Sequence, residues 1–526
     1  MKNNTVAATL AALLFGLIVL SLLDPKISFI SKVTVRAAAN LNLIFLQGNH
    51  TDEMACQEAA SMVARVVTAS CPTCVLTAQE CVAGRDIDAG RYLGNQPLQF
   101  PSARATNGVI VYQSDSADIA LSTCKGAETQ TAGKSHQLTC DPPNIPRKSR
   151  GDTHIAMSLT SLKFWLTTLI VPFGISFLLG WGIIRYERLH ANWSTDHVDG
   201  GPQKFHETPT PRIGGACVAA GLLSCASLLP VLNFPDVGNE ITLLLVAGFA
   251  PFAGGLAEDL LKSAGVLNRL LFTMIGAAIA SWLLGAILPA VDIPGLDALL
   301  QWSPVAIAFT VFAVSGVSNS INIIDGFNGL AGGFAILVLM SLAYVATQVG
   351  DQAIFAASIM LIGALFGFLY WNYPKGRIFL GDGGAYLVGF WLAELSVLLV
   401  VRNPAVSPWF PLLLLAYPVF ETLFSSYRRA LLRGRPAGHP DGLHLHTLFF
   451  RRVVGRRIGS SPPKTVTERN NSVAPQILLI SLICIIPALL FWRNSRWLAA
   501  GTIFFCLYYS WLYFRITRWK TPRWLQ

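Results

Sequence analysis

The stretch NSINIIDGFNGLAGG, residues 319–333, separates two apolar runs and is itself polar and rich in glycine. The neighbouring runs, residues 303–322 and 329–348, have about the length that a helix needs to cross a bilayer, roughly 20 apolar residues. Asparagines, an aspartate and glycines therefore stand where one predicted span ends and the next begins. Irregular polar backbone at this depth is tolerated where it lines a water-filled cavity. The stretch predicts a membrane protein with a polar pocket at the ends of its helices.

The composition of the whole chain agrees with this interpretation. Of the 526 residues, 53% are hydrophobic and 13% are charged, against roughly 25% charged in an ordinary soluble domain. We predict a polytopic α-helical membrane protein with an N-terminal transmembrane anchor, residues 1–23, and about eleven core spans. The predicted spans are 6–23, 164–184, 213–234, 241–257, 270–290, 303–322, 329–348, 353–371, 384–401, 408–426, 475–492 and 497–514.

The net charge of +10 does not indicate nucleic-acid binding, because Lys and Arg gather in the loops on one side of the predicted spans. This asymmetry marks the cytoplasmic side of a membrane protein. It places the N-terminus inside, residues 24–157 outside and the loop that carries His444 inside. We therefore expect a multi-pass protein in contact with the lipid bilayer and without a nucleic-acid partner.

Residues 24–157 differ from the rest: they are polar, contain no predicted span and hold six of the ten cysteines. LNLIFLQG (41–48) and NGVIVYQS (107–114) predict strands, and DEMACQEAASMVARVV (52–67) predicts a helix. We expect a small extracytoplasmic α/β domain with disulfides, whose pairing stays open because six cysteines can pair in many ways. The candidate cysteines are Cys56, Cys71, Cys74, Cys81, Cys124 and Cys140.

Five polar clusters fall on the predicted cytoplasmic side of the remaining domain, residues 158–526. Loops that are far apart in the sequence and converge on one membrane face predict a single site there. The clusters are KFHETPTPRIGG (204–215), AEDLLKSAGVLNR (257–269), the opening stretch, WNYPKGRIFLGDGG (371–384) and YRRALLRGRPAGHPDGLHLHTLFFRR (427–452).

The residue types in these clusters indicate phosphoryl chemistry. Glu258 and Asp259 form a carboxylate pair at a membrane boundary, which is costly unless it is solvated or paired with a cation. Carboxylate and amide oxygens suit Mg²⁺, with Mn²⁺ as an alternative. Asp382 lies among glycines that let a ligand approach the backbone closely, and nearby Arg and His can neutralise phosphate charge. We predict metal-assisted phosphoryl transfer to a lipid.

In this order, the motifs PTPRIGG, ED, NSINIIDGFNGLAGG, IFLGDGGA and DGLHLHTL resemble those of the polyprenyl-phosphate N-acetylhexosamine-1-phosphate transferases. This glycosyltransferase family includes undecaprenyl-phosphate GlcNAc-1-phosphate transferases and is related to the phospho-MurNAc-pentapeptide translocase. The resemblance covers about residues 158–526. It implies transfer of a HexNAc-1-phosphate from a UDP-sugar to undecaprenyl phosphate in the bacterial inner membrane, with release of UMP and a need for Mg²⁺. The product would begin a surface glycan such as O-antigen or capsule.

The resemblance also implies which residues form the site. It implies catalytic roles for Glu258, Asp259, Asp325 and Asp382, of which Asp259, Asp325 and Asp382 would bind the metal. The residues expected to contact the substrates are Thr210, Arg212, Asn319, Asn322, Asn372, Arg377, Arg428, Arg429, Asp441, His444 and His446.

Three positions depart from the family pattern. Glu258 stands for the first aspartate of the acidic pair, Asn328 for the second aspartate of DGxDG, and Thr447 for a third histidine. Asn328 cannot act as a base. Asp259 either acts as a base or positions the nucleophile, since a phosphate monoester is already largely dianionic at neutral pH.

Alternatives remain for the function. Arg212 and the DGLHLHT loop favour the HexNAc branch, and the peptidoglycan translocase is the alternative of the same class. A lipid-linked glycan transporter would bring polar groups to the bilayer midplane rather than to one face. A membrane-anchored redox sensor would rest on Cys71-Pro-Thr-Cys74, around which no thioredoxin-like pattern is present. The identity of the UDP-sugar and the formation of a homodimer stay open.

Overall fold

A computed structural model describes residues 29–38, 41–50, 53–70, 75–83, 102–105, 108–114, 139–141, 164, 166–196, 206–232, 234–261, 265–433, 442–454 and 465–518. The chain divides into two compact units, Met1–Thr153 and His154–Gln526, each with its own hydrophobic core. The predicted anchor, residues 1–23, and the predicted boundary near residue 157 lie outside the described residues.

The first unit is an antiparallel sheet with a helix packed against it, which confirms the predicted α/β character. The strand order is β3-β1-β2-β5-β4-β6. Val33 of β1 is buried against Ala60 and Ala64 of the helix α2, because alternate strand residues and one helix face are apolar. The elements are β1 (Phe29–Ala38), β2 (Leu41–His50), α2 (Glu53–Ser70), β3 (Val75–Ala83), β4 (Ser102–Ala105), β5 (Gly108–Ser114) and β6 (Thr139–Asp141).

A disulfide joins Cys56 of α2 to Cys81 of β3, across 25 residues of sequence. This bond confirms disulfide use for two of the six predicted cysteines. Cys71, Cys74 and Cys124 lie outside the described residues, as does the side chain of Cys140.

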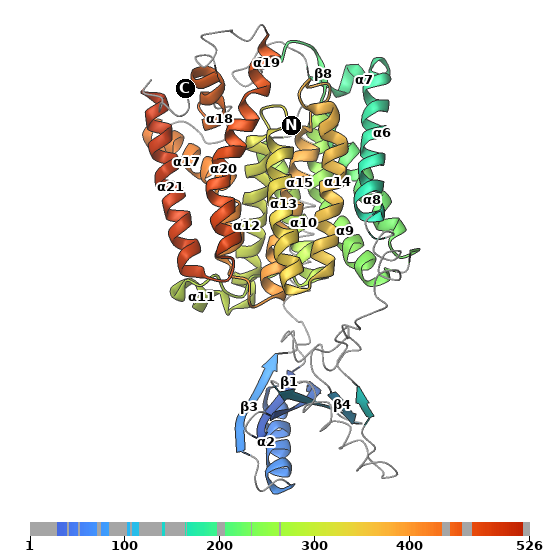
Figure 1. Cartoon of the computed structure of the whole chain (residues 1–526), viewed down its shortest axis with the longest axis vertical. Coiled ribbons are helices and arrows are strands. Elements are labelled where there is room, and N and C mark those ends of the chain that lie inside the picture. The colour runs from blue at the N-terminus through green and yellow to red at the C-terminus, as the bar shows by residue number, and fades with distance from the viewer. Residues whose placement is uncertain are drawn as a thin grey trace, which may run out of the picture. The chain divides into compact units, whose positions relative to one another are not determined.

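The second unit is a helical bundle (Figure 1). Within the described residues, nine helices are long and apolar enough to cross a membrane, which confirms a polytopic protein. The elements are η1 (Leu166–Ile170), α6 (Val171–Arg185), α7 (Glu187–Ser194), β7 (Thr195–Asp196), β8 (Thr210–Pro211), α8 (Gly215–Leu228), α9 (Pro235–Leu261), α10 (Val266–Leu284), α11 (Pro294–Leu300), α12 (Ser303–Ile324), α13 (Leu330–Val349), α14 (Gln352–Asn372), α15 (Gly381–Arg402), α16 (Trp409–Leu414), α17 (Ala416–Arg433), α18 (Leu445–Leu448), η2 (Phe449–Val454), α19 (Val466–Asn471), α20 (Val473–Leu490) and α21 (Ser495–Thr517).

Two predicted spans differ from the structure. The run 213–234 forms α8, a helix of 14 residues, followed by a turn that contains Pro230. The run 408–426 forms α16 and α17 with a break at Leu415. Pro418 explains this break, since it lacks an N–H to donate to the carbonyl of Leu414 and its ring crowds that carbonyl.

The helix α15 is the centre of the bundle. In its apolar stretch 89% of the residues are buried, against 28% in that of α21. It packs against α8, α9, α12 and α13. At the end where α15 begins, the backbone of Phe379 bonds to Pro211 of β8. The elements α7, β8, α18 and α19 lie at one end of the bundle, the upper end in Figure 1, and α11 lies at the other. The bundle thus gathers the motif-bearing loops at one end.

Candidate functional site

The site is built around the first turn of α15. The buried carboxylate of Asp259, near the end of α9, accepts hydrogen bonds from the backbone N–H groups of Asp382 (3.0 Å) and Gly383 (2.8 Å). A carboxylate is stabilised there because a helix N-terminus carries unpaired N–H groups and a partial positive charge. Gly255 permits this approach, since a Cβ at that residue would lie 2.5 Å from the carbonyl oxygen of Asp382.

Gly381 supplies the second close approach of the site. Its φ of +75° lies in the left-handed region, and a Cβ at this position would overlap the carbonyl oxygen of Arg212. The GDGG sequence therefore brings the PTPRIGG loop directly onto the start of α15.

Two arginines and an asparagine hold the carboxylates. Arg212 Nε lies 3.1 Å from Asp259 Oδ1, and one of its terminal nitrogens lies 3.8 Å from Asp382 Oδ1. Asn322 donates to Asp382 Oδ1 at 2.8 Å, and Arg269 of α10 pairs with Asp382 Oδ2. Burial lowers the pKa of Arg212, but the carboxylates, Asp259 first, outweigh it and raise the pKa above its ordinary value.

Asp325 adds a third carboxylate at the end of α12. Burial, with the nearby carboxylates of Asp382 and Asp259, raises the pKa of Asp325 to about 8, against the opposing effect of Arg212. Burial is the largest of these effects, so the raised pKa reports mainly the loss of solvation around the carboxylate of Asp325.

The residues of this cluster fit a divalent cation by their chemistry. Three carboxylates and the amide of Asn322 offer the hard oxygen ligands that a divalent cation such as Mg²⁺ takes. In the described part of the chain, however, no three His, Cys, Asp or Glu side chains are arranged so that they could hold a metal. Arg269 and Arg212 explain this, because they take up the carboxylate oxygens of Asp382 and Asp259.

Glu258 behaves differently from its neighbour Asp259. One of its oxygens, Oε2, is buried and has no hydrogen-bond partner among the described residues. Within the described residues, Asp259, the second residue of the pair, accepts the hydrogen bonds that join α9 to α15.

An amide network fixes the turn that follows Asp325. Asn372 accepts from Gly329 N at 2.7 Å and donates to Ile378 O at 2.8 Å. Asn328 donates from its side chain to Asn471 Oδ1 at 3.1 Å, and its backbone N–H donates to Asn470 Oδ1 at 2.9 Å. Asn328 thus has a structural partner, which explains why an amide suits this position.

The histidine loop approaches the same turn. The ring of His446 lies 5.6 Å from the ring of Phe327 and stacks on His444 with a centroid distance of 5.2 Å. Glu421 of α17 bonds to His444 Nδ1 at 3.0 Å. The structure therefore brings both predicted histidines next to the residues that follow Asp325.

The other predicted substrate residues occupy varied places. Thr210 of β8 donates to Thr208 O at 3.0 Å, and Asn319 accepts from Tyr386. Arg428 packs over the ring of Tyr513, and its neighbour Arg429 is half-buried. Arg377 is exposed, and Asp441 lies outside the described residues.

Sequence reasoning missed three groups of this site. Arg269 ends the polar cluster 257–269 but carried no predicted role. Glu421 lies inside the predicted span 408–426, and a carboxylate within an apolar run is itself a signal of function. For Asn470 and Asn471 the sequence offered no signal, because their partner Asn328 is distant along the chain.

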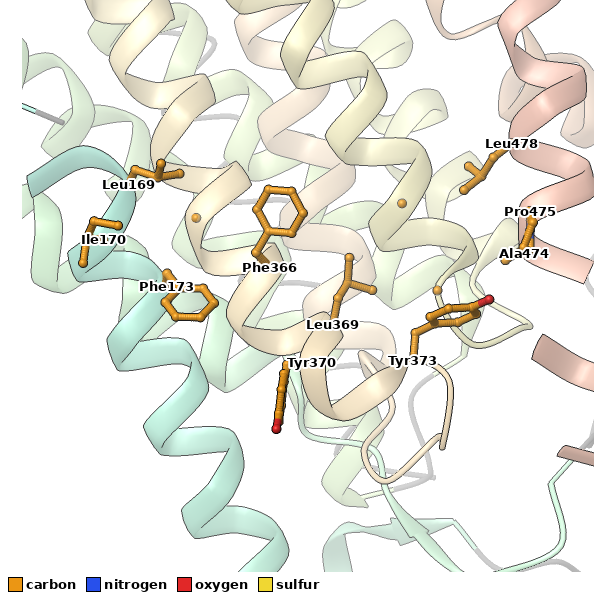
Figure 2. Close-up of a pocket in the computed structure, with 13 residues that line it drawn as sticks. Leu169, Ile170, Phe173, Phe366, Leu369, Tyr370, Tyr373, Ala474, Pro475 and Leu478 are labelled. Carbon is orange, nitrogen blue, oxygen red and sulfur yellow. The ribbon is translucent and has the colours of Figure 1, made fainter. Parts of the chain in front are cut away.

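A separate pocket lies between helices of the bundle and has a volume of about 740 Å³ (Figure 2). Apart from the hydroxyls of Tyr370 and Tyr373, its lining side chains are apolar, so it is unsuited to chemistry on charged groups. It borders the site at Gly329. The lining residues are Leu169, Ile170, Phe173, Gly329, Gly333, Gly363, Phe366, Leu369, Tyr370, Tyr373, Ala474, Pro475 and Leu478.

The bundle and the carboxylates and arginines at one of its ends define a polytopic membrane protein with a charged site. Residues 241–400 match the family model described as glycosyl transferase family 4. This match and the relatives below confirm the resemblance to polyprenyl-phosphate N-acetylhexosamine-1-phosphate transferases.

Three curated relatives illustrate the similarity. The chain is 29% identical over 245 residues to a probable undecaprenyl-phosphate N-acetylglucosaminyl 1-phosphate transferase of Bacillus subtilis. The aligned region covers 46% of this chain and 66% of the relative. It is 30% identical over 273 residues to a decaprenyl-phosphate N-acetylglucosaminephosphotransferase of Mycobacterium leprae, with the same two coverages. It is 26% identical over 283 residues to a phospho-N-acetylmuramoyl-pentapeptide-transferase of Caldanaerobacter subterraneus, covering 51% of this chain and 87% of the relative. The chain thus spans just under two thirds of the first two relatives.

Proposed function

We propose that the protein transfers a HexNAc-1-phosphate from a UDP-sugar to undecaprenyl phosphate and releases UMP, as the first step of a surface glycan such as O-antigen or capsule. The observation that carries this proposal is the meeting of Asp259, Asp325 and Asp382 with Arg212 and Arg269 at one end of the bundle. The names of the relatives support a polyprenyl phosphate acceptor and a sugar-linked donor.

The reaction requires little proton transfer from the protein. An oxygen of the lipid phosphate forms a bond to the β-phosphorus of the donor, and the bond from that phosphorus to the bridging oxygen breaks, so that UMP leaves. The lipid phosphate is already largely dianionic at neutral pH. Asp259, whose oxygens hold α15 and Arg212, therefore acts in this proposal as a positioning group rather than as a base.

The arginines supply positive charge for the phosphates. Arg212 and Arg269 can neutralise charge on the donor diphosphate, as in phosphoryl transfer generally. Mg²⁺, or Mn²⁺ in its place, held by oxygens of Asp259, Asp325 and Asp382, would add charge neutralisation when bound. Arg269 would compete with such an ion for the carboxylate of Asp382.

The same class offers one alternative, phospho-MurNAc-pentapeptide transfer, because relatives with that name also match the chain. One experiment separates the two. Membranes that contain the purified protein are supplied with undecaprenyl phosphate, Mg²⁺ and either a panel of UDP-HexNAc donors or UDP-MurNAc-pentapeptide, and release of UMP is followed. We expect release with a UDP-HexNAc donor and none with Asp382→Asn. Release of UMP only with the pentapeptide donor would favour the alternative. If none of the donors gives UMP, the transferase class is rejected.

We also propose that the protein lies in the bacterial inner membrane with residues 24–157 on the periplasmic side and the site on the cytoplasmic side, supported by the distribution of Lys and Arg. A cysteine-free variant can carry a single reporter cysteine at Ser114 or at Ser461. An impermeant thiol reagent should label intact cells at position 114 and not at 461. The reverse pattern would overturn this topology.

A further inference from the structure

Glu421 is a buried carboxylate with a specific set of partners. It lies on α17 with 1% of its side chain exposed. Oε1 lies 3.0 Å from His444 Nδ1, and both carboxylate oxygens lie 3.1 Å from the backbone N of Leu445. A carboxylate in apolar surroundings is costly unless such donors satisfy it.

These contacts determine which ring nitrogen of His444 carries a proton in the contact with Glu421. An ionised carboxylate can only accept hydrogen bonds, so the proton of this contact must reside on Nδ1 of the imidazole. The second ring nitrogen, Nε2, is then the one free to bind another group. The Leu445 N–H is also one of the unpaired donors at the start of α18, so Glu421 fixes the backbone of the loop as well as the ring.

The orientation of His444 is passed on to His446 by direct packing. The two rings are stacked, with an interplanar angle of 13°. His446 in turn contacts Phe327, and its Nδ1 lies 3.4 Å from the hydroxyl of Tyr417. The contacts therefore run from Glu421 through both histidines to the turn that follows Asp325.

We propose that Glu421 is the positioning residue of the His444–His446 pair, and that it holds the two imidazoles at the turn after Asp325 to bind the diphosphate of the nucleotide donor. The role of the histidines in this inference rests on the proposed function. The part of the inference that concerns the position of the rings does not depend on the proposed function, because it is argued from the contacts of Glu421, His444 and His446.

The chain contains a matched control in Glu394. This glutamate of α15 is also fully buried in the bundle, but neither of its oxygens has a hydrogen-bond partner among the described residues. Glu421→Gln and Glu394→Gln replace a carboxyl group by an amide at two buried positions of the same bundle. A difference between them therefore reports on the contacts of Glu421 rather than on the loss of a buried acid.

The first measurement does not depend on activity. The protein is labelled with ¹⁵N-histidine and placed in lipid, and the ring nitrogens of His444 are assigned by their loss in His444→Asn. We expect protonated Nδ1 in the wild type and in Glu394→Gln. In Glu421→Gln, whose neutral amide no longer requires a proton on Nδ1, we expect a changed or mixed tautomer. An unchanged His444 spectrum in Glu421→Gln would overturn the positioning role.

The second measurement is steady-state transfer to undecaprenyl phosphate. Glu421→Gln should lower kcat roughly 10–100-fold, the loss seen when a carboxylate that orients a metal-binding histidine is removed. Glu421→Asp should lower kcat less. Glu394→Gln should stay within about twofold of the wild type. Because Glu421 acts through His444, the double variant Glu421→Gln/His444→Asn should be little worse than His444→Asn alone. Additive losses, or an equal loss in Glu394→Gln, would refute the proposal.

The two measurements separate the failure of this inference from that of the proposed function. If the wild-type protein releases UMP from none of the donors tested, the proposed transferase activity is rejected, and with it the diphosphate as the ligand of the histidines. The NMR comparison would still decide whether Glu421 fixes His444.

Discussion

The carboxylate of Asp259 accepts the backbone N–H of Gly383 across 2.8 Å, and thereby ties the end of α9 to the first turn of α15. The same carboxylate accepts the N–H of Asp382, the residue whose side chain faces Arg269 and Asn322. A residue from the acidic pair thus fixes the backbone that presents the carboxylate of the GDGG motif.

The first prediction concerns this link. Asp259→Ala should lower the free energy of unfolding by at least about 1 kcal/mol, since loss of a helix-capping side chain costs roughly that much, and Arg212 would also lose its partner. A thermal melt in detergent measures the effect. Asp236→Asn, at an exposed aspartate in the first turn of α9, is the control and should melt like the wild type. Equal melting temperatures for Asp259→Ala and Asp236→Asn would contradict the capping role.

Asp382→Asn should abolish transfer while the protein stays folded. The carboxylate lies in a polar cluster with 13% of its side chain exposed, so its loss removes charge rather than packing. Metal-assisted charge stabilisation contributes several kcal/mol to such barriers, and we expect a loss in rate on the order of 10³. UMP release at saturating Mg²⁺ measures it, with the melting temperature as the control for folding. Near-normal release would reject the assignment.

Arg269→Gln should strengthen the binding of Mg²⁺. In the structure Arg269 pairs with Asp382, so it would compete with a metal ion for this carboxylate. Partly exposed ion pairs contribute up to about 1 kcal/mol, and the half-saturating Mg²⁺ concentration should fall by roughly fivefold. The rise of the melting temperature with added Mg²⁺ reports this concentration.

The matched variant for this test is Arg402→Gln, which removes an arginine paired with Glu240 at the other end of α15. Its half-saturating Mg²⁺ concentration should equal that of the wild type. If Arg269→Gln weakens Mg²⁺ binding instead, the arginine supports the metal site rather than competing for it.

Asn328→Asp should destabilise the protein although the two residues have nearly the same shape. The new carboxylate would face the oxygens of Asn471 and Pro374, to which the amide now donates. A buried polar group without its partner costs about 1–3 kcal/mol. Asn494→Asp is the control, because Asn494 caps α21 as an acceptor and aspartate caps equally well. The same melting temperature in both variants would show that the Asn328 amide is not needed.

Removal of the disulfide should affect the first unit alone. Cys81→Ser opens the bond to Cys56 and should cost that unit roughly 2–5 kcal/mol, the usual loss for a native disulfide in a small domain. Limited proteolysis should show faster cleavage of the first unit. Transfer should be unchanged, because the proposed site lies wholly in the second unit. Cys506→Ser, which removes a free thiol, should leave proteolysis as in the wild type.

The local features of the bundle could be predicted from the sequence. Apolar runs of about 20 residues indicate spans on their own, because the bilayer sets that length. In the part of the chain that the structure describes, nine of them are helices of the expected kind. The predictions for 213–234 and 408–426 were less accurate, since Pro230 and Pro418 end or break a helix within an otherwise apolar run. The strands 41–48 and 107–114 and the helix 52–67 were confirmed for the same reason, the period of their apolar residues.

The sequence by itself determined the class of the protein, the motif residues and the gathering of those motifs at one end of the bundle, because hydrophobic length and local spacing carry this information. Only the tertiary structure decided that Asp259 caps α15, that Arg269 pairs with Asp382, and that Glu421 holds His444. Each of these pairs joins residues of different elements, and a hydrogen bond or ion pair acts over a few ångströms whatever the separation along the chain. Their partners are therefore set by how the helices pack around α15, which no local pattern of the sequence records.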